Sequence, residues 1–225
     1  MDDFALVTEG PSDQAVLENI LFGYFKEQRE PAVNRELPNP QDDKGGWTLL
    51  FQYLREKKFR DAFQLNRYLI IQVDTDVSEE PGFDVPHHDE HGPLTPDELV
   101  EKIIERLKEE IGEPYLTIYA GKFIFAIAMD EIECWVLPLW YEDAHAESIT
   151  GCIAKLGHCA KLKKELKEQR LRWIRPEEKK YTSYAYASRG YRKPKPLAEI
   201  GRKNPSLALF LDQLDQMDLT LPPEE

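Results

Sequence analysis

The sequence has no apolar run that approaches the ~20 residues a membrane-spanning helix needs. Residues 1–3, Met-Asp-Asp, are acidic and lead directly into an apolar stretch, so we expect no signal peptide. Cysteine is scarce: the chain holds only Cys134, Cys152 and Cys159, and no two of them form a Cys-x-x-Cys pair. This odd number without that spacing predicts a reducing, cytoplasmic compartment and no structural zinc.

Positive charge is also in short supply. The chain carries 29 Lys and Arg against 42 Asp and Glu, a net charge of −13, which argues against a protein that coats DNA by itself. The charge is uneven, because residues 151–205 hold 16 Lys and Arg against 5 Asp and Glu. That segment is therefore at +11 and the remaining chain at −24. A basic segment beside an acidic site suits a nucleic-acid backbone, although a solvated basic helix has the same composition.

Two short acidic motifs each follow an apolar run. Residues 4–8 lead into Glu-Gly-Pro-Ser-Asp at 9–13, and residues 68–73 lead into Asp-Thr-Asp at 74–76. The carboxyl ends of buried strands meet at one rim of an α/β sheet, where ligands bind. In an extended backbone, Asp74 and Asp76 would point the same way. Two carboxylates 4 Å apart repel by about 4 kcal/mol at an effective dielectric of 20, and a hard divalent cation removes that cost.

Hydrophobic spacing along the 225 residues predicts an α/β fold with a mainly helical C-terminal part. We expect strands at residues 4–8, 68–73, 115–120 and 123–128. We expect helices at 13–28, 47–58, 95–111, 131–140, 152–170 and 205–217. Thr95, Pro96 and Glu98 provide a typical helix start. Loops are expected at 31–46 and 77–94.

These motifs resemble those of the Toprim fold, the metal-binding module of topoisomerases, primases and OLD-family nucleases. That family places Glu-Gly-x-x-Asp after one strand and Asp-x-Asp after a later one, as residues 9–13 and 74–76 do here. Ile132-Glu133-Cys134-Trp135 is similar to an Ile-Glu-x-Trp segment of small standalone Toprim-like proteins. The resemblance implies a three-layer sheet with helices on both faces. It implies a metal-binding domain at 1–145, with the basic helical segment 146–225 packed on it.

The resemblance also implies a set of carboxylates that binds Mg²⁺ or Mn²⁺: Glu9, Asp13, Asp74, Asp76 and Glu133. Glu9 would bind metal or act as a general base, and its alternative role is to cap the following helix. Asp13 is either a second ligand or the acidic residue of the first helical turn. We expect the neighbouring Asp130 and Glu131 to favour a helix start, and Trp135 to lie in the core.

OLD-family nucleases use a basic residue near the scissile phosphate. Lys180, Lys193 and Lys195 are the candidates here, and our hypothesis assigns Lys193 and Lys195 to catalysis. The tyrosines nearby either stack on bases or, as we expect, pack the C-terminal segment onto the sheet; they are Tyr181, Tyr184, Tyr186 and Tyr191. Three histidines lie in the polar stretch 77–94, which we interpret as a surface loop rather than a metal site: His87, His88 and His91.

The leading functional hypothesis is a metal-dependent nuclease acting on DNA or RNA. Proteins of this kind look like effectors that work beside an ATPase in bacterial defence against phage. The chain has no Gly-x-x-x-x-Gly-Lys-Ser/Thr, so that ATPase would be a separate subunit, and oligomers are possible. We expect weak nucleic-acid binding by the isolated chain. The alternatives are a non-catalytic Toprim-like binding subunit and a haloacid-dehalogenase-like phosphatase with Asp74 as its nucleophile.

Overall fold

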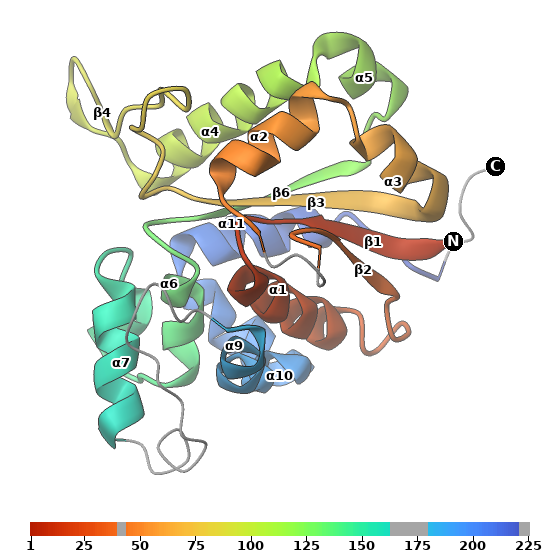
Figure 1. Ribbon diagram of the computed structural model, residues 1–225. Helices are drawn as coiled ribbons and strands as arrows, with labels where there is room; N and C mark the ends of the chain where they lie inside the picture. The colour runs from red at the N-terminus through yellow and green to blue at the C-terminus, as the bar shows by residue number, and fades with distance from the viewer. Residues whose placement is uncertain (40–43, 163–179, 221–225) are drawn as a thin grey trace.

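The computed structural model describes residues 1–39, 44–162 and 180–220. Its centre is a four-stranded, fully parallel sheet with helices on both faces (Figure 1). In spatial order the strands are β2 (Val33–Leu37), β1 (Asp2–Val7), β3 (Asn66–Asp74) and β6 (Phe123–Ala128). The predicted α/β class with two helical layers is confirmed, and the layout is Rossmann-like.

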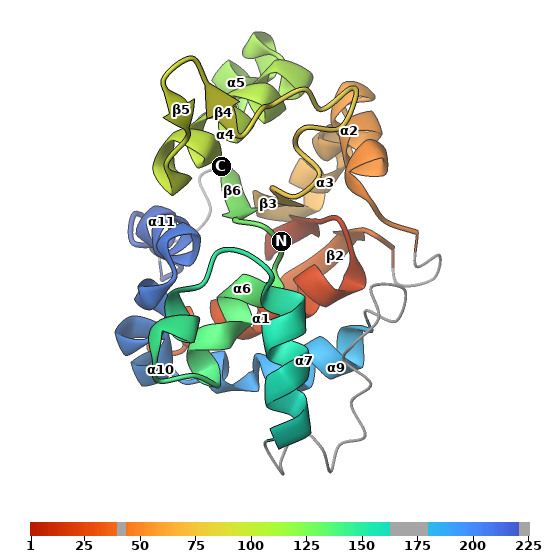
Figure 2. The same cartoon turned by 90° about the vertical axis from the view of Figure 1, so that its left-hand side faces the viewer.

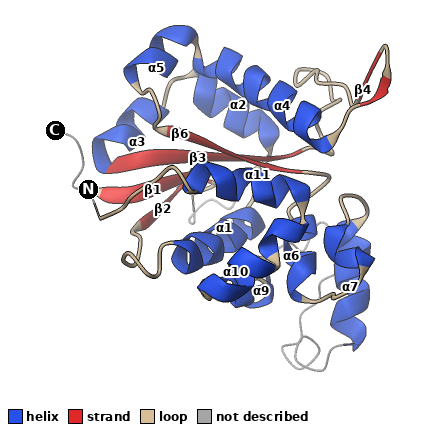
Figure 3. Cartoon of the chain, turned by 180° about the vertical axis from the view of Figure 1, so that it is seen from behind, coloured by secondary structure: helices blue, strands red, loops and turns tan. Residues whose placement is uncertain are grey.

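One helical layer comes from the middle of the chain. It contains α2 (Trp47–Arg55), α3 (Phe59–Leu65), α4 (Pro96–Ile111) and α5 (Glu113–Ile118). The opposite layer contains α1 (Pro11–Tyr24), α6 (Glu133–Val136), α7 (Cys152–Leu162), α9 (Tyr181–Ala187), α10 (Pro194–Glu199) and α11 (Pro205–Leu214). Short 3₁₀ helices connect this layer: η1 (Leu137–Leu139), η2 (Ala144–Glu147), η4 (Arg189–Arg192) and η5 (Gly201–Lys203). Figure 3 shows both layers from behind.

The strands read as continuous apolar runs because both faces of the sheet are covered. Ala5 and Val7 pack against the layer of α2 and α4, while Phe4 and Leu6 pack against α1 and the C-terminal helices. The hydrophobic core on the α1 face of the sheet includes residues from both sides of the predicted domain boundary at residue 145, among them Tyr191. The amino-terminal part and the C-terminal segment therefore share one hydrophobic core.

Most of the predicted helices are found. The helix at Thr95 has the expected capping box, in which the Thr95 side chain accepts from the Glu98 amide and Glu98 accepts from the Thr95 amide. The predicted helices at 47–58 and 205–217 correspond to α2 and α11. Of the helix expected at 152–170, α7 covers the first part, and residues 163–179 lie outside the described chain.

Two predicted elements are wrong. Residues 115–120, expected as a strand, belong mainly to α5, because Gly112 ends α4 with φ +86° and Pro114 stands in the first turn of a new helix. Residues 31–46, expected as a loop, contain β2. The hydrophobic pattern does not predict this strand, because it is an edge strand of half-buried residues, three of them polar. The loop at 77–94 does hold a small ribbon, β4 (His88–Asp89) with β5 (Gly92–Pro93).

The pairing of the cysteines does not fit the reducing compartment that their number and spacing predict. Cys134 at the start of α6 and Cys152 at the start of α7 form a disulfide, and Cys159 is buried and is not part of it. Disulfides persist mainly in oxidising compartments, so the cysteines no longer support a cytoplasmic location. Among the described helices, none combines the length and apolar character needed to cross a membrane.

The C-terminal layer approaches α1 closely at one glycine. A Cβ placed on Gly23 would lie 1.7 Å from the carbonyl oxygen of Tyr191 in η4. Only a residue without a side chain allows the two backbones to come this close.

We therefore predict that Gly23→Ala destabilises the protein by roughly 1–3 kcal/mol through overpacking. The intrinsic preference of helices has the opposite sign, since Ala normally improves on Gly by about 1 kcal/mol. Urea denaturation measures the difference, with Glu101→Ala on the exposed face of α4 as the control. A gain in stability for Gly23→Ala would contradict the close packing of η4 on α1.

Candidate functional site

The sheet order creates a switch point between β1 and β3. From β1 the chain crosses through α1 to β2 on one side, and from β3 it crosses through α4 to β6 on the other. Connections that leave in opposite directions open a crevice outside the strand ends, where open α/β sheets bind ligands. Figure 2 faces this edge, with α1, α6 and α7 below the sheet and the β4–β5 ribbon above it. Glu9 and Asp74 follow or end the two strands that flank the crevice.

Glu9 and Asp74 are in direct contact across this switch point. Oε1 of Glu9 accepts a hydrogen bond from the backbone amide of Asp74 at 2.7 Å. Gln72, fully buried on β3, completes a small network. Its Oε1 accepts from the Glu9 amide at 3.2 Å, and its Nε2 donates to Oδ1 of Asp74 at 2.9 Å. The Glu9 carboxylate thus reaches the backbone of Asp74, and Gln72 is hydrogen-bonded to both residues.

Glu9 directly precedes the N-cap position of α1, which Gly10 occupies. Backbone from another segment closes on Glu9, since the Gly46 amide donates to the Glu9 carbonyl at 2.6 Å. A Cβ on Gly45 would lie 1.9 Å from that same oxygen. The Glu9 carboxylate is therefore positioned by β3 and its backbone by residues 45–46.

Asp13 lies in the first turn of α1 and is buried. Ser12 donates to its Oδ1 at 3.3 Å, and its Oδ2 lies 3.2 Å from the position a Cβ on Gly10 would occupy. The positive end of the helix dipole stabilises the Asp13 carboxylate, as expected if Asp13 is the acidic residue of the first helical turn. Its place beside Gly10 also keeps it next to Glu9, so the geometry accommodates both predicted roles.

Asp76 is placed differently from Asp74. β3 ends at Asp74, which is 7% exposed, and a turn begins at Thr75 with a hydrogen bond from the Ser78 amide. Asp76 lies in this turn and is exposed. The extended geometry expected to align Asp74 with Asp76 is therefore absent. The turn is tied to the end of β6, because the Asp76 amide donates to the Asp130 carbonyl at 3.1 Å.

Glu133 is fully buried at the start of α6. The Tyr184 hydroxyl from α9 donates a hydrogen bond to its Oε1. Burial first, and then the Glu133 carboxylate, raise the pKa of Tyr184, with smaller effects from Asp13 and Glu131. The Tyr184 hydroxyl therefore lies within the field of several carboxylates. Trp135 is in the core as expected, stacked on Phe210.

The neighbouring carboxylates serve a helix start, although not that of α6. Oδ2 of Asp130 accepts from the Gly151 amide at 2.6 Å, and Oε1 of Glu131 accepts from the Ile153 amide at 2.8 Å. Both bonds satisfy backbone donors at the beginning of α7, which have no partner within the helix. These two residues thus hold α7 beside the edge of the sheet.

The described residues contain one cluster in which three potential metal-ligand atoms lie within 4.8 Å of one another. It consists of Asp130, Cys134 and Cys152, not of the predicted carboxylates. The disulfide engages both sulfurs, so this cluster does not suit a metal. Mg²⁺ keeps several waters and takes only one or two protein carboxylates. The oxygen donors of Glu9 and Asp74 fit that requirement without a closed ligand cage.

The candidate lysines are not brought to this edge. The Tyr191 carbonyl packs on Gly23 in the last turn of α1, whereas Glu9 precedes the first turn. At 1.5 Å per residue, these two ends of α1 are roughly 20 Å apart. Lys193 and Lys195 lie two and four residues after Tyr191, and both are exposed. The Lys195 Nζ is 3.8 Å from a Glu199 carboxylate oxygen. The structure thus separates both residues from the predicted catalytic glutamate.

Lys180 lies nearer the middle of α1. It is the exposed N-cap residue of α9, and the adjacent Tyr181 donates from its hydroxyl to Glu18 at 2.5 Å. Burial, and then this contact, raise the pKa of Tyr181 to about 12. Tyr184 and Tyr191 are buried in the core, so the expectation that these tyrosines pack the C-terminal segment onto the fold is confirmed for them.

His87 anchors the 77–94 loop to the turn that carries Asp76. Its Nε2 is 2.9 Å from the Thr75 carbonyl oxygen and 2.9 Å from the Ser78 hydroxyl. His88 and His91 are exposed and do not join it in a ligand cluster among the described residues. Sequence reasoning did not identify Gln72, Tyr184 or His87 as parts of this edge. Of these three, only Gln72 could have been recognised from the sequence, because it is a polar residue inside an apolar strand.

Comparisons with protein-family models, with curated proteins and with solved structures find no match for this chain. The assignment of the site therefore depends on its geometry.

We predict that Gln72→Leu lowers the free energy of unfolding by about 1–3 kcal/mol, because it removes the side-chain bonds to the Glu9 amide and the Asp74 carboxylate. Thermal and urea denaturation measure the loss. Gln64→Leu, on the exposed surface of α3, is the matched control. Equal stability of the two variants would show that the Gln72 network does not hold the strand ends together.

Proposed function

We propose that this protein is a divalent-metal-dependent nuclease that hydrolyses phosphodiester bonds in DNA or RNA with a Toprim-type site. The contact between Glu9 and the Asp74 amide across the switch point carries the proposal. It supports the proposal because two carboxylates from adjacent strand ends share one edge of the sheet, where a phosphate oxygen and a cation can both reach them. The buried carboxylates of Asp13 and Glu133 extend the acidic edge along α1 and α6.

In this proposal Glu9 and Asp74 would hold Mg²⁺ or Mn²⁺, and Asp13, Asp76 and Glu133 would be further oxygen donors of the same edge. The bound cation would activate water and stabilise the leaving oxygen. Alternatively, Glu9 would act as the general base for the attacking water, with one of its oxygens held by the Asp74 amide. Gln72 keeps the Asp74 carboxylate from rotating.

The proposed setting is an assembly with a separate ATPase, as in bacterial defence against phage. The −24 balance outside residues 151–205 suits docking to a basic partner, and it disfavours tight binding of nucleic acid by the chain alone. The basic segment would then supply the local attraction for a phosphate backbone.

Glu9→Gln and Asp74→Asn test the site with nearly isosteric changes. We expect each to abolish Mg²⁺- or Mn²⁺-dependent cleavage of plasmid DNA and RNA. We also expect each to reduce the rise in melting temperature that the cation gives the unmodified protein, because binding to the folded state stabilises it. Glu101→Gln, an exposed carboxylate on α4, should keep both properties. Full cleavage by either site variant would refute the proposal.

Substitution of the exposed lysines tests whether the nucleic acid passes over them. We predict that Lys193→Ala combined with Lys195→Ala weakens nucleic-acid binding. If both lysines contact phosphates, the slope of log affinity against log salt should fall by about 0.9 per contact on duplex DNA. Fluorescence anisotropy over a salt series measures it, with Lys108→Ala on α4 as control. An unchanged slope would assign both lysines to solvent.

A further inference from the structure

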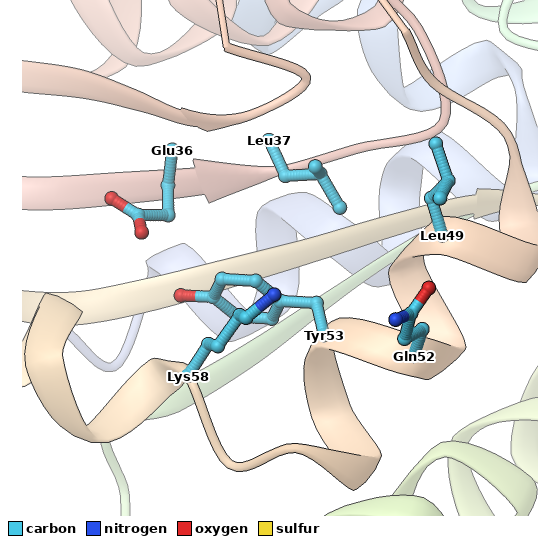
Figure 4. Close-up of a pocket in the computed structure, with 6 residues that line it drawn as sticks. All are labelled: Glu36, Leu37, Leu49, Gln52, Tyr53 and Lys58. Carbon is cyan, nitrogen blue, oxygen red and sulfur yellow. The ribbon is translucent and has the colours of Figure 1, made fainter.

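A pocket lies between β2 and α2. It has a volume of about 240 Å³ and is lined by Glu36, Leu37, Leu49, Gln52, Tyr53 and Lys58 (Figure 4). Pockets for drug-sized ligands begin at roughly 300 Å³. This pocket therefore suits a single functional group on a short stem, and not a whole nucleotide.

Tyr53 places an unpartnered hydroxyl in this pocket. The residue is 4% exposed, and in the described part of the chain its oxygen has no hydrogen-bond partner within 3.5 Å. A buried hydroxyl without a partner is costly, and most such groups in native proteins have one. The Tyr53 hydroxyl therefore points to a polar group that occupies the pocket from outside the chain.

Glu36 supplies the charge. In the described part of the chain, no cation comes within ion-pair distance of its carboxylate, and Lys58 pairs with Glu56 at 2.7 Å instead. Burial raises the pKa of Glu36, the nearby Asp61 carboxylate adds to this rise, and the Tyr53 hydroxyl opposes it. Burial and the Asp61 charge thus outweigh the contribution of Tyr53, and a cationic ligand would stabilise the charged carboxylate.

We propose that this pocket binds a guanidinium group carried on an aliphatic stem, the chemistry of an arginine side chain. The planar guanidinium matches a carboxylate with two parallel hydrogen bonds, here to Glu36, and has further donors for the Tyr53 hydroxyl. The Gln52 side-chain N–H donates a hydrogen bond to Glu56, and its amide oxygen is an additional acceptor for the guanidinium. Leu37 and Leu49 cover the stem, as apolar surface does for the methylenes of long cationic side chains.

The guanidinium site adjoins the acidic edge without depending on it. Leu37 lies in its wall, and the Leu37 carbonyl accepts from the Thr8 amide at 2.8 Å, one residue before Glu9. No metal and no nucleic acid are needed for binding in this pocket. The test below is therefore independent of the proposed nuclease activity.

Isothermal titration of the full chain with agmatine and with a capped Gly-Arg-Gly peptide tests the site. Binding of agmatine as tight as that of the peptide assigns the pocket to a free small molecule. Binding of the peptide alone assigns it to an arginine of a partner protein. Failure of both to bind up to millimolar concentration overturns the proposal. Butylamine, which carries an ammonium group on a similar stem, is titrated as the control. Equal binding of butylamine and agmatine overturns the preference for guanidinium.

Two variants separate binding from folding. Glu36→Gln should weaken guanidinium binding at least about tenfold, since a hydrogen bond to a charged group is lost. Tyr53→Phe should weaken it by roughly 2–10-fold and leave the melting temperature nearly unchanged, because the hydroxyl lies near Glu36 without a well-formed hydrogen bond in the free chain. Glu109→Gln, exposed on α4, and Tyr115→Phe on α5 are the matched controls. Unchanged affinity in both pocket variants would overturn the assignment.

Discussion

The parallel pairing of β1 with β3 is the constraint on which the acidic edge depends. Its register places Val7 opposite Ile71, so the residues that follow β1 reach the end of β3 together. A slip by one residue would turn the buried side chains of a strand to the opposite face. It would also separate the Glu9 carboxylate from the Asp74 amide. The two apolar cores, one on each face, therefore fix the site as well as the fold.

The C-terminal segment completes this edge from the opposite direction. Asn19 on α1 donates to the Ala185 carbonyl and to the Ser188 hydroxyl, both at 2.8 Å, which fastens α9 to α1. That attachment brings the Tyr184 hydroxyl to Glu133. Glu133 on α6 thus depends for its surroundings on a residue 51 positions away, and α1 is held by residues more than 160 positions away.

Apolar runs and helix starts were readable from the sequence, because they depend on neighbouring residues. The strands at β1, β3 and β6 and the capping box at Thr95 belong to this group. β2 was not readable, since its position at the sheet edge removes the apolar pattern. The pairing of Cys134 with Cys152 and the distance of Lys193 from Glu9 depend on how helices pack, and no local spacing encodes that.

The two edges of the sheet are closed by different means. On β6, the Gln213 side chain of α11 accepts from the Phe125 amide at 3.0 Å and donates to the Phe125 carbonyl at 2.7 Å. One amide side chain thereby imitates the pairing of a neighbouring strand and blocks that position to any other chain. Among the described hydrogen bonds of β2, no side chain has the same role, so the two edges of the sheet present different backbone surroundings.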